Sequence, residues 1–215
     1  MSPDKTNILI INGSLRGDKG NSQALAEQAR SLIAARPGAA AEILPLAGLQ
    51  ARVEVVYRQL CGYDGFLVIS GVYWNSWSSP LQRFLEVATA FELSPAFWGK
   101  PVACAVSMDS VGGSDVAARL HAAFSGLGCW CPPCATLVLS RVGQEAIKAS
   151  EGKANNPNDD VWRPDDLEII VANLVTAAAK DRSVWQQWPH LGLKSAKGDW
   201  PSQGPLDLGA PVFLP

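Results

Sequence analysis

The stretch that decides the fold joins an apolar run to a loop of small and polar residues, and it reads Ile8-Leu9-Ile10-Ile11-Asn12-Gly13-Ser14-Leu15-Arg16-Gly17-Asp18-Lys19-Gly20-Asn21-Ser22. Its first four residues form a continuous apolar run, as expected of a parallel strand covered on both faces. The glycines, hydroxyls and arginine that follow bind an anion where backbone N–H groups and a helix N-terminus converge. The stretch therefore predicts a buried strand, a phosphate-binding loop and a helix.

Length, charge and cysteine content limit the classes of protein to consider. A chain of 215 residues favours one domain with extensions over two domains. The formal net charge of −2 provides no basic footprint for nucleic acid. No apolar run approaches the roughly 20 residues that span a bilayer, and residues 1–6 lack a signal-peptide pattern. Five cysteines, an odd count, argue against a secreted disulfide framework. We therefore expect a soluble, cytoplasmic protein without a nucleic-acid or membrane partner.

Strands and helices alternate along the chain. Further short strands are predicted over 41–47, 66–70, 102–107 and 135–139, separated by apolar residues at helical spacing. We expect Asn21 or Ser22 to cap the first helix, over 21–36, and Pro80 to be the first residue of the third helix. Ser114 and Asp115 are expected to cap the next one. Five strands alternating with helices predict an α/β fold, a doubly wound parallel sheet with helices on both faces.

The C-terminal third departs from this alternation. Residues 141–163 are polar and interrupted by Pro157, so we expect an insertion before a last helix that begins at Pro164. After Trp188 the chain is rich in proline, and residues 189–215 are expected to form an extended tail. The predicted organisation is thus one domain over 1–188, followed by the tail.

Three loops at the carboxyl ends of the strands should form the binding site, because ligands bind at that edge of doubly wound sheets. They are 12–22, 71–79 and 107–114. In the first loop Gly13 allows close backbone approach, Ser14 and Ser22 offer hydroxyls, and Arg16 can form paired hydrogen bonds to an anion. Neither G-x-x-x-x-G-K-[ST] nor G-x-G-x-x-G fits the loop. The structural alternative is an ordinary turn rich in Gly, Ser and Asn.

The other two loops suit a planar heteroaromatic ring. Tyr73 and Trp74 supply flat apolar contact, and Asn75 can form hydrogen bonds with polar ring edges. The alternative is that the tryptophans fill the core or a subunit interface. In the third loop the backbone N–H groups of Gly112 and Gly113 could donate to ring carbonyls, although a Gly-Gly pair taken alone favours a plain turn.

The segment Cys129-Trp130-Cys131-Pro132-Pro133-Cys134 brings three thiols close in sequence. The spacing is poor for a metal site, since no C-x-x-C pair recurs and the only histidines are His121 and His190. We therefore favour a structural role for these cysteines. A hydrolase triad is also disfavoured, because no G-x-S-x-G motif is present.

The chain resembles the NAD(P)H-dependent FMN reductase family of flavodoxin-like proteins. The resemblance covers about residues 7–139 and rests on the segments Gly13-Ser14-Leu15-Arg16, Gly20-Asn21-Ser22, Val72-Tyr73-Trp74-Asn75, Pro80-Leu81, Tyr63-Asp64-Gly65 and Pro132-Pro133. It implies a flavodoxin-like sheet with strand order 2-1-3-4-5. Three positions depart from the family pattern. Gly71 stands where the family has a proline, Gln82 where it has a lysine, and Glu86 where it has an aspartate.

The resemblance also implies the roles of the site residues, with FMN as cofactor and NAD(P)H as co-substrate. The FMN phosphate is assigned to Ser14, Arg16, Asn21 and Ser22. The isoalloxazine ring is assigned to Val72, Tyr73, Trp74 and Asn75, and its pyrimidine side to Ser107, Asp109, Gly112 and Gly113. No catalytic side chain is expected, since the cofactor performs the chemistry.

The predicted function is transfer of hydride from NAD(P)H to the flavin N5, followed by reduction of a quinone, free flavin or similar small-molecule acceptor in a ping-pong scheme. Two alternatives stay open. One is a flavodoxin-type electron carrier without nicotinamide turnover, which the small net charge disfavours. The other is a flavin-free domain that binds another phosphate ligand or a partner. A homodimer or homotetramer is expected from the family, and aromatic residues are candidates for its interface, namely Trp77, Trp98, Trp185 and Trp188.

Overall fold

The computed structural model describes residues 5–17, 20–149 and 165–186. Five strands form one parallel sheet in the order β2-β1-β3-β4-β5. The strands are β1 (Thr6–Asn12), β2 (Ala39–Pro45), β3 (Gly65–Gly71), β4 (Val102–Met108) and β5 (Thr136–Ser140). The predicted fold class and strand order are confirmed, and the strand order reverses between β1 and β3, where ligands bind in such sheets.

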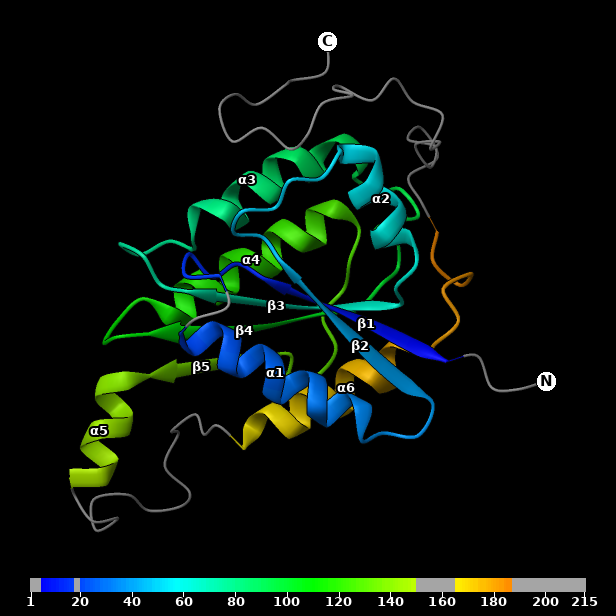
Figure 1. Ribbon diagram of the computed structural model, residues 1–215. Helices are drawn as coiled ribbons and strands as arrows, with labels where there is room; N and C mark the ends of the chain where they lie inside the picture. The colour runs from blue at the N-terminus through cyan, green and yellow to red at the C-terminus, as the bar shows by residue number, and fades with distance from the viewer. Residues whose placement is uncertain (1–4, 18–19, 150–164, 187–215) are drawn as a thin grey trace.

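Helices cover both faces of the sheet (Figure 1). One layer contains α1 (Asn21–Ala34) and α6 (Asp166–Ala178), which contact each other. The opposite layer contains α2 (Val53–Cys61), α3 (Ser79–Ala88), the short 3₁₀ helix η1 (Thr89–Phe91) and α4 (Gly113–Leu127). A further helix, α5 (Arg141–Ala149), extends from the end of β5. The fold is therefore a three-layer α/β sandwich.

The apolar run in β1 explains why the sheet is buried on both sides. The side chains of Ile8, Leu9, Ile10 and Ile11 are all 0% exposed. Because successive side chains of a strand point to opposite faces, Leu9 and Ile11 join the core beneath α2, α3 and α4. Ile8 and Ile10 join the second core beneath α1 and α6. A strand in this position needs apolar residues at every place, which is the pattern that the sequence shows.

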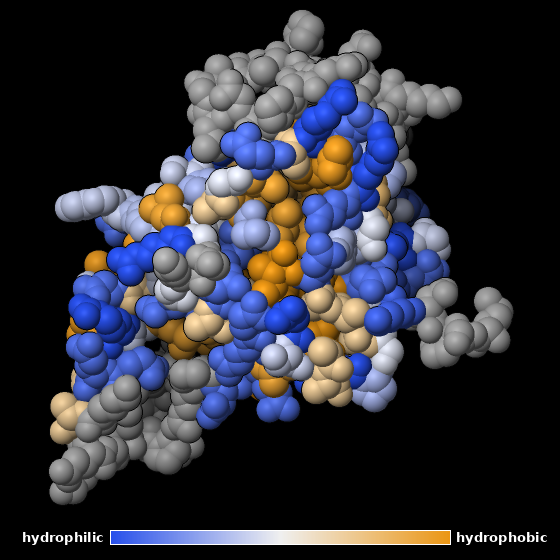
Figure 2. Space-filling view, viewed as in Figure 1, coloured by the Kyte–Doolittle hydropathy of each residue, from blue (hydrophilic) through white to orange (hydrophobic). Residues whose placement is uncertain are grey.

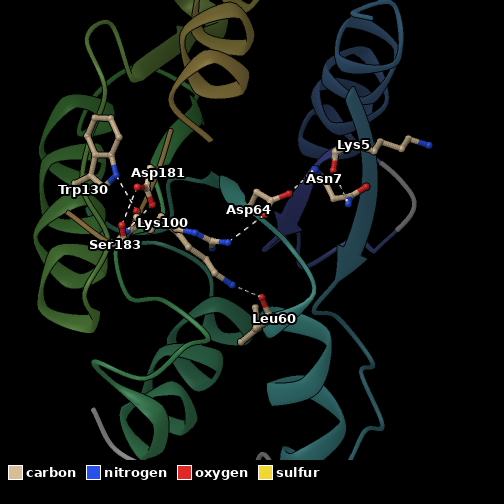
Figure 3. A network of polar contacts seen from close by, with 10 residues as sticks. Lys5, Asn7, Leu60, Asp64, Lys100, Trp130, Asp181 and Ser183 are labelled. Atoms are coloured by element: carbon tan, nitrogen blue, oxygen red, sulfur yellow. Dashed lines mark hydrogen bonds and ion pairs between the residues drawn. The ribbon is translucent and has the colours of Figure 1, made fainter. Parts of the chain in front are cut away.

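A polar network holds the amino ends of the strands together, at the edge opposite the expected site (Figure 3). The Asp64 carboxylate accepts a hydrogen bond from the Asn7 N–H at 2.9 Å and pairs with Arg182 at 3.3 Å. The buried Lys100 ammonium donates to the Leu60 carbonyl at 2.7 Å. Burial lowers the pKa of Lys100 to about 8. This edge of the sheet thus contains an ammonium that is costly to keep charged.

The helix starts differ from the sequence prediction in a consistent way. The N-cap of α1 is Gly20 (φ 104°), where Asn21 or Ser22 was expected. The N-cap of α4 is Gly112 (φ 89°), where Ser114 and Asp115 were expected. No side chain caps either helix. Both turns need a positive φ, which a residue with a Cβ rarely adopts. In α3, Ser79 is the first helical residue, and the Ser78 hydroxyl accepts from the Leu81 N–H at 3.4 Å. Pro80 is therefore the second residue of that helix and not the first.

The insertion predicted over 141–163 begins with a helix that the sequence analysis did not predict, since Arg141–Ala149 form α5. The last helix starts at Asp166, and the predicted start at Pro164 and the tail over 189–215 lie outside the described residues.

No helix in the described part of the chain is long and apolar enough to span a bilayer. On the face that Figure 2 shows, hydrophobic residues form a band through the middle of the molecule, with hydrophilic residues on either side.

Candidate functional site

A cavity of about 280 Å³ lies at the carboxyl edge of the sheet, between the loops that follow β1, β3 and β4. Its volume is close to the lower end of the roughly 300–1,000 Å³ typical of ligand sites. The lining residues are Ser14, Arg16, Gly20, Asn21, Ser22, Gly71, Val72, Tyr73, Ser107, Met108, Asp109 and Arg141. All three predicted loops contribute to this one cavity.

One end of the cavity carries hydrogen-bond donors for an anion. Ser14 and Ser22 are buried there, and the Arg16 guanidinium is exposed at the rim. Helix α1 begins at Asn21, so its first N–H groups have no acceptor within the helix, and no side chain caps them. Those N–H groups and the helix dipole favour negative charge at this position.

Hydrogen bonds within the first loop fix the shape of this donor set. The Ser14 N–H donates to the Asn12 Oδ1 at 3.0 Å, and the Arg16 N–H donates to the Ser14 Oγ at 3.2 Å. The Asn12 amide in turn donates to Gln23 on α1 at 2.7 Å. Asn12 therefore joins the end of β1 to Ser14 in the loop and to Gln23 on α1 by hydrogen bonds that need no ligand.

Gly13 has a packing role that differs from the one the sequence suggested. A Cβ at Gly13 would lie 3.0 Å from the Leu81 Cβ and 3.1 Å from the Ser78 Oγ. The loop therefore packs against the start of α3, and Gly13 is absent from the cavity lining. Close contact with a phosphate is instead available at Gly20, where a Cβ would meet only the Arg16 Cδ, at 3.6 Å.

The second loop forms a tight two-residue turn. Tyr73 and Ser76 exchange backbone hydrogen bonds of 2.7 and 3.0 Å around Trp74 (φ 50°) and Asn75 (φ 60°), the conformation of a type I′ turn. The Trp74 side chain is fully exposed, and Arg119 of α4 donates to the Asn75 carbonyl. The turn thus directs Trp74 to solvent and leaves Tyr73 in the cavity wall.

Gly71 stands where the family pattern has a proline, and the structure gives the substitution a physical reason. A Cβ at Gly71 would lie 3.2–3.4 Å from ring and hydroxyl atoms of Tyr73. The Tyr73 ring therefore packs directly against the Gly71 backbone. A Cβ at this position would require the Tyr73 ring to shift by a few tenths of an ångström.

The third loop places its glycines away from the cavity. A Cβ on Gly113 would lie 2.4 Å from the Val138 Cγ1, so this glycine is needed for packing. The Gly113 N–H donates to the Met108 Sδ at 3.2 Å, instead of pointing toward a ligand. The loop contributes Ser107, Met108 and Asp109 to the cavity, and the Asp109 carboxylate pairs with Arg141 at 2.6 Å.

The structure brings eight of the twelve predicted site residues to the cavity and places four outside its lining. Those in the lining are Ser14, Arg16, Asn21, Ser22, Val72, Tyr73, Ser107 and Asp109, and those outside it are Trp74, Asn75, Gly112 and Gly113. The sequence analysis missed Gly20, Gly71, Met108 and Arg141. Arg141 directly follows the carboxyl end of β5, so the rule that located the other loops could have found it.

The tryptophans predicted for an interface take different positions. Trp77 is half-buried, with the Arg119 guanidinium 5.1 Å from its ring centre, and Trp98 is half-buried. Trp185 is exposed and lies 6.0 Å from Trp130 between ring centres. Trp188 lies outside the described residues. A homodimer or homotetramer therefore stays a prediction.

Fold and cavity together define a class, a flavodoxin-like domain with a ligand-sized cavity at the carboxyl ends of its strands. Residues 6–144 match the model of the NADPH-dependent FMN reductase family, and the chain belongs to this family. FMN is accordingly its cofactor and NAD(P)H its reductant. No curated protein sequence matches the chain.

Three solved structures illustrate the shared fold. RosB with a bound 8-demethyl-8-formylriboflavin-5'-phosphate is 16% identical, with a TM-score of 0.63 over 80% of this chain and 79% of that one. The apo NADH:FMN oxidoreductase EMOB is 17% identical, with a TM-score of 0.63 over 83% and 93%. The NAD(P)H:acceptor oxidoreductase FerB from Paracoccus denitrificans is 20% identical, with a TM-score of 0.54 over 80% and 97%. At these identities the likeness shows the fold alone.

The residues of the cavity fit FMN in their chemistry. A phosphate dianion needs several N–H and O–H donors, and the buried serines, the helix N-terminus and Arg16 supply them at one end. A flat ring with polar edges needs apolar contact and a few hydrogen-bonding groups, and Val72, Tyr73 and Met108 lie with Ser107 in the remaining lining. One end of the cavity is thus suited to an anionic phosphate and the other to a flat, largely apolar ring, which are the two parts of FMN.

Proposed function

We propose that the protein holds FMN noncovalently in this cavity and uses NAD(P)H to reduce a quinone, free flavin or similar small acceptor in a ping-pong scheme. The observation that carries the proposal is the single cavity built by three strand-end loops, with anion donors at one end and apolar groups at the other. Membership of the NADPH-dependent FMN reductase family supports the same reaction class.

In this proposal the first loop binds and orients the phosphate. The hydroxyls of Ser14 and Ser22 and the N–H groups at the start of α1 donate hydrogen bonds in a buried setting, where such bonds are strong. Arg16 adds a positive charge at the rim. Because hydrogen bonds of Asn12 already hold Ser14 and the first turn of α1, these donors lose little conformational entropy on binding.

The second and third loops contact the ring. Bound FMN supplies the redox chemistry, namely acceptance of a hydride at N5 and its transfer to the acceptor. Val72 and Tyr73 orient the ring by packing, and Ser107 offers a hydroxyl to a polar ring edge. No side chain of the cavity needs to donate or accept a proton in this scheme.

A second cavity, of about 290 Å³, adjoins the first and offers space for NAD(P)H or the acceptor. It shares Asn21, Ser107, Met108 and Arg141 with the first and continues between α1 and α5. Its remaining lining is Ala24, Leu25, Gln28, Leu139, Ser140 and Gln144. The apolar part of this lining suits an aromatic substrate, and Arg141, which pairs with Asp109 and Glu145, lies at the boundary that the two cavities share.

Reduction and reoxidation of the reconstituted protein test the proposal. The full chain is loaded with FMN, freed of excess flavin and mixed without oxygen with NADPH or NADH. We expect the visible flavin absorbance to be lost with at least one of the two and to return when benzoquinone is added. Absence of reduction without an added reductase would show an electron carrier instead, and protein that retains no FMN would contradict the site itself.

A further inference from the structure

A thiol, an imidazole and a hydroxyl contact one another near the amino end of β5, away from the FMN cavity at the carboxyl ends of the strands. The Cys131 Sγ lies 2.9 Å from the His121 Nδ1, and the His121 Nε2 lies 2.8 Å from the Thr136 Oγ1. His121 belongs to α4, Cys131 to the segment before β5, and Thr136 is the first residue of β5. Thr136 is therefore at the amino end of its strand, whereas the FMN cavity is at the carboxyl ends, and none of the three residues lines that cavity.

A thiol beside an imidazole that contacts a third polar group is the arrangement of an activated nucleophile, its base and the group that orients the base. A thiol becomes a better nucleophile when an adjacent base can take its proton and a third group orients that base. Cys131 can donate its S–H to Nδ1 only in the tautomer that carries its proton on Nε2. The Thr136 hydroxyl can accept a hydrogen bond from that Nε2–H, so its contact orients the ring in a form of His121 that acts as a base toward Cys131.

The environment determines the resting state of the pair. Burial lowers the pKa of His121 and raises the pKa of Cys131, so both groups are neutral at pH 7. Among the described residues, the fully buried Cys104 also faces His121; its Sγ lies 3.9 Å from Nδ1, and burial raises its pKa well above 9. In the part of the chain that the structure describes, no group of three or more His, Cys, Asp and Glu is placed to hold a metal. The arrangement therefore fits proton transfer and not metal binding.

We propose that Cys131 is a nucleophilic thiol that His121 activates toward hydroperoxides, which oxidise it to a sulfenic acid. The Cys131 sulfur attacks the terminal peroxide oxygen, an S–O bond forms and the O–O bond breaks. The thiol proton passes to the His121 Nδ1 and then to the leaving oxygen. The products are the sulfenic acid and an alcohol, or water when the oxidant is hydrogen peroxide, so sulfur loses the two electrons that the peroxide gains.

The chain contains a matched control for this reaction. Cys134 is also an exposed free cysteine, three residues further along the same segment. Among the described residues it has no imidazole contact, because those of His121 are with Cys104, Cys131 and Thr136. Differences between Cys131 and Cys134 therefore report the effect of the histidine instead of general exposure.

The test compares the two thiols in one sample. The full chain, without FMN or NAD(P)H, is treated with hydrogen peroxide and dimedone, and labelling of each cysteine is followed by peptide mass spectrometry. We expect Cys131 to be labelled at least tenfold faster than Cys134. The rate of Cys134, which has no imidazole beside it among the described residues, should rise steeply with pH, whereas the Cys131 rate should vary little above the His121 pKa and fall below it.

Two variants extend the test. His121→Gln should lower the Cys131 rate to that of Cys134 and give it the same pH slope, and Thr136→Val should lower it partly. Equal rates for the two thiols in the wild type, or identical pH slopes, would overturn the proposal. These wild-type measurements decide the matter even if a variant does not fold.

Discussion

Replacing Gly20 with alanine tests whether the anion-binding loop depends on one backbone conformation. Gly20 has φ 104° and ψ −177°, in a region that is essentially restricted to glycine. A Cβ at this position would meet only the Arg16 Cδ, at 3.6 Å, so space is available. The cost of the substitution is therefore backbone strain, about 1–3 kcal/mol.

This cost can appear in either of two measurements. If alanine keeps the native conformation, the free energy of unfolding falls by about 1–3 kcal/mol. If the backbone relaxes, the first N–H groups of α1 move away from the phosphate and the Kd for FMN rises roughly 5- to 140-fold, the same energy expressed as affinity. We expect the two losses together to lie in this range.

Urea denaturation of the FMN-free protein and a fluorescence titration with FMN measure the two losses. Gly126→Ala is the control, because Gly126 lies within α4 and a Cβ there would meet no atom within 4 Å. That change should stabilise the protein by about 0.5–1 kcal/mol and leave FMN binding unchanged. If Gly20→Ala alters neither stability nor affinity, the account of the loop is wrong.

Three further changes are predicted. Arg16→Ala should weaken FMN binding about tenfold, the lower end for a charge-assisted hydrogen bond because the guanidinium is exposed, with riboflavin titration and urea denaturation expected to show no change. Lys100→Met tests the buried ammonium, whose pKa is about 8 in the native protein and ordinary in the unfolded chain. Between these two pKa values the unfolded state binds more protons than the native state, so the stability of the wild type should rise with pH relative to that of the variant. The rise should reach up to about 3 kcal/mol between pH 8 and 10.5. A difference in the free energy of unfolding that stays constant over this range in urea denaturation would contradict this. Trp74→Asn should raise the free energy of unfolding by about 0.5–1 kcal/mol, because the Trp74 side chain is fully exposed and asparagine tolerates a positive φ better, whereas a loss of stability would show that Trp74 makes contacts that matter.

Much of the fold could be predicted from the sequence because buried parallel strands and helix faces leave strong apolar patterns. Val53, Val56, Tyr57 and Leu60 recur at helical spacing in the sequence, and all four are buried on α2. The helix starts were harder to predict, because Ser, Asn and Asp are the usual caps and the sequence offered them beside the glycines that cap α1 and α4. Only the geometry of the turn, with a positive φ, reveals the glycine cap.

The site was predictable where a loop directly follows a strand and less so where packing determines which atoms face the cavity. Gly113 looked like a backbone donor for the ring, but its N–H turns to Met108 and its lack of a side chain makes room for Val138. Trp74 looked like a ring contact, but the two-residue turn directs it to solvent. Both outcomes depend on neighbours distant in sequence, which local patterns do not encode.

The most direct test of the central claim, that the cavity after β1 holds the phosphate of FMN, is a comparison of FMN with riboflavin. Both ligands contain the same ring, and only FMN carries the phosphate. Titration of the full, flavin-free chain by flavin fluorescence should show FMN binding at least about 100-fold tighter, close to 3 kcal/mol, as expected from two charge-assisted hydrogen bonds at the low end of their strength. Equal affinity for FMN and riboflavin, or no binding of either, would contradict the account.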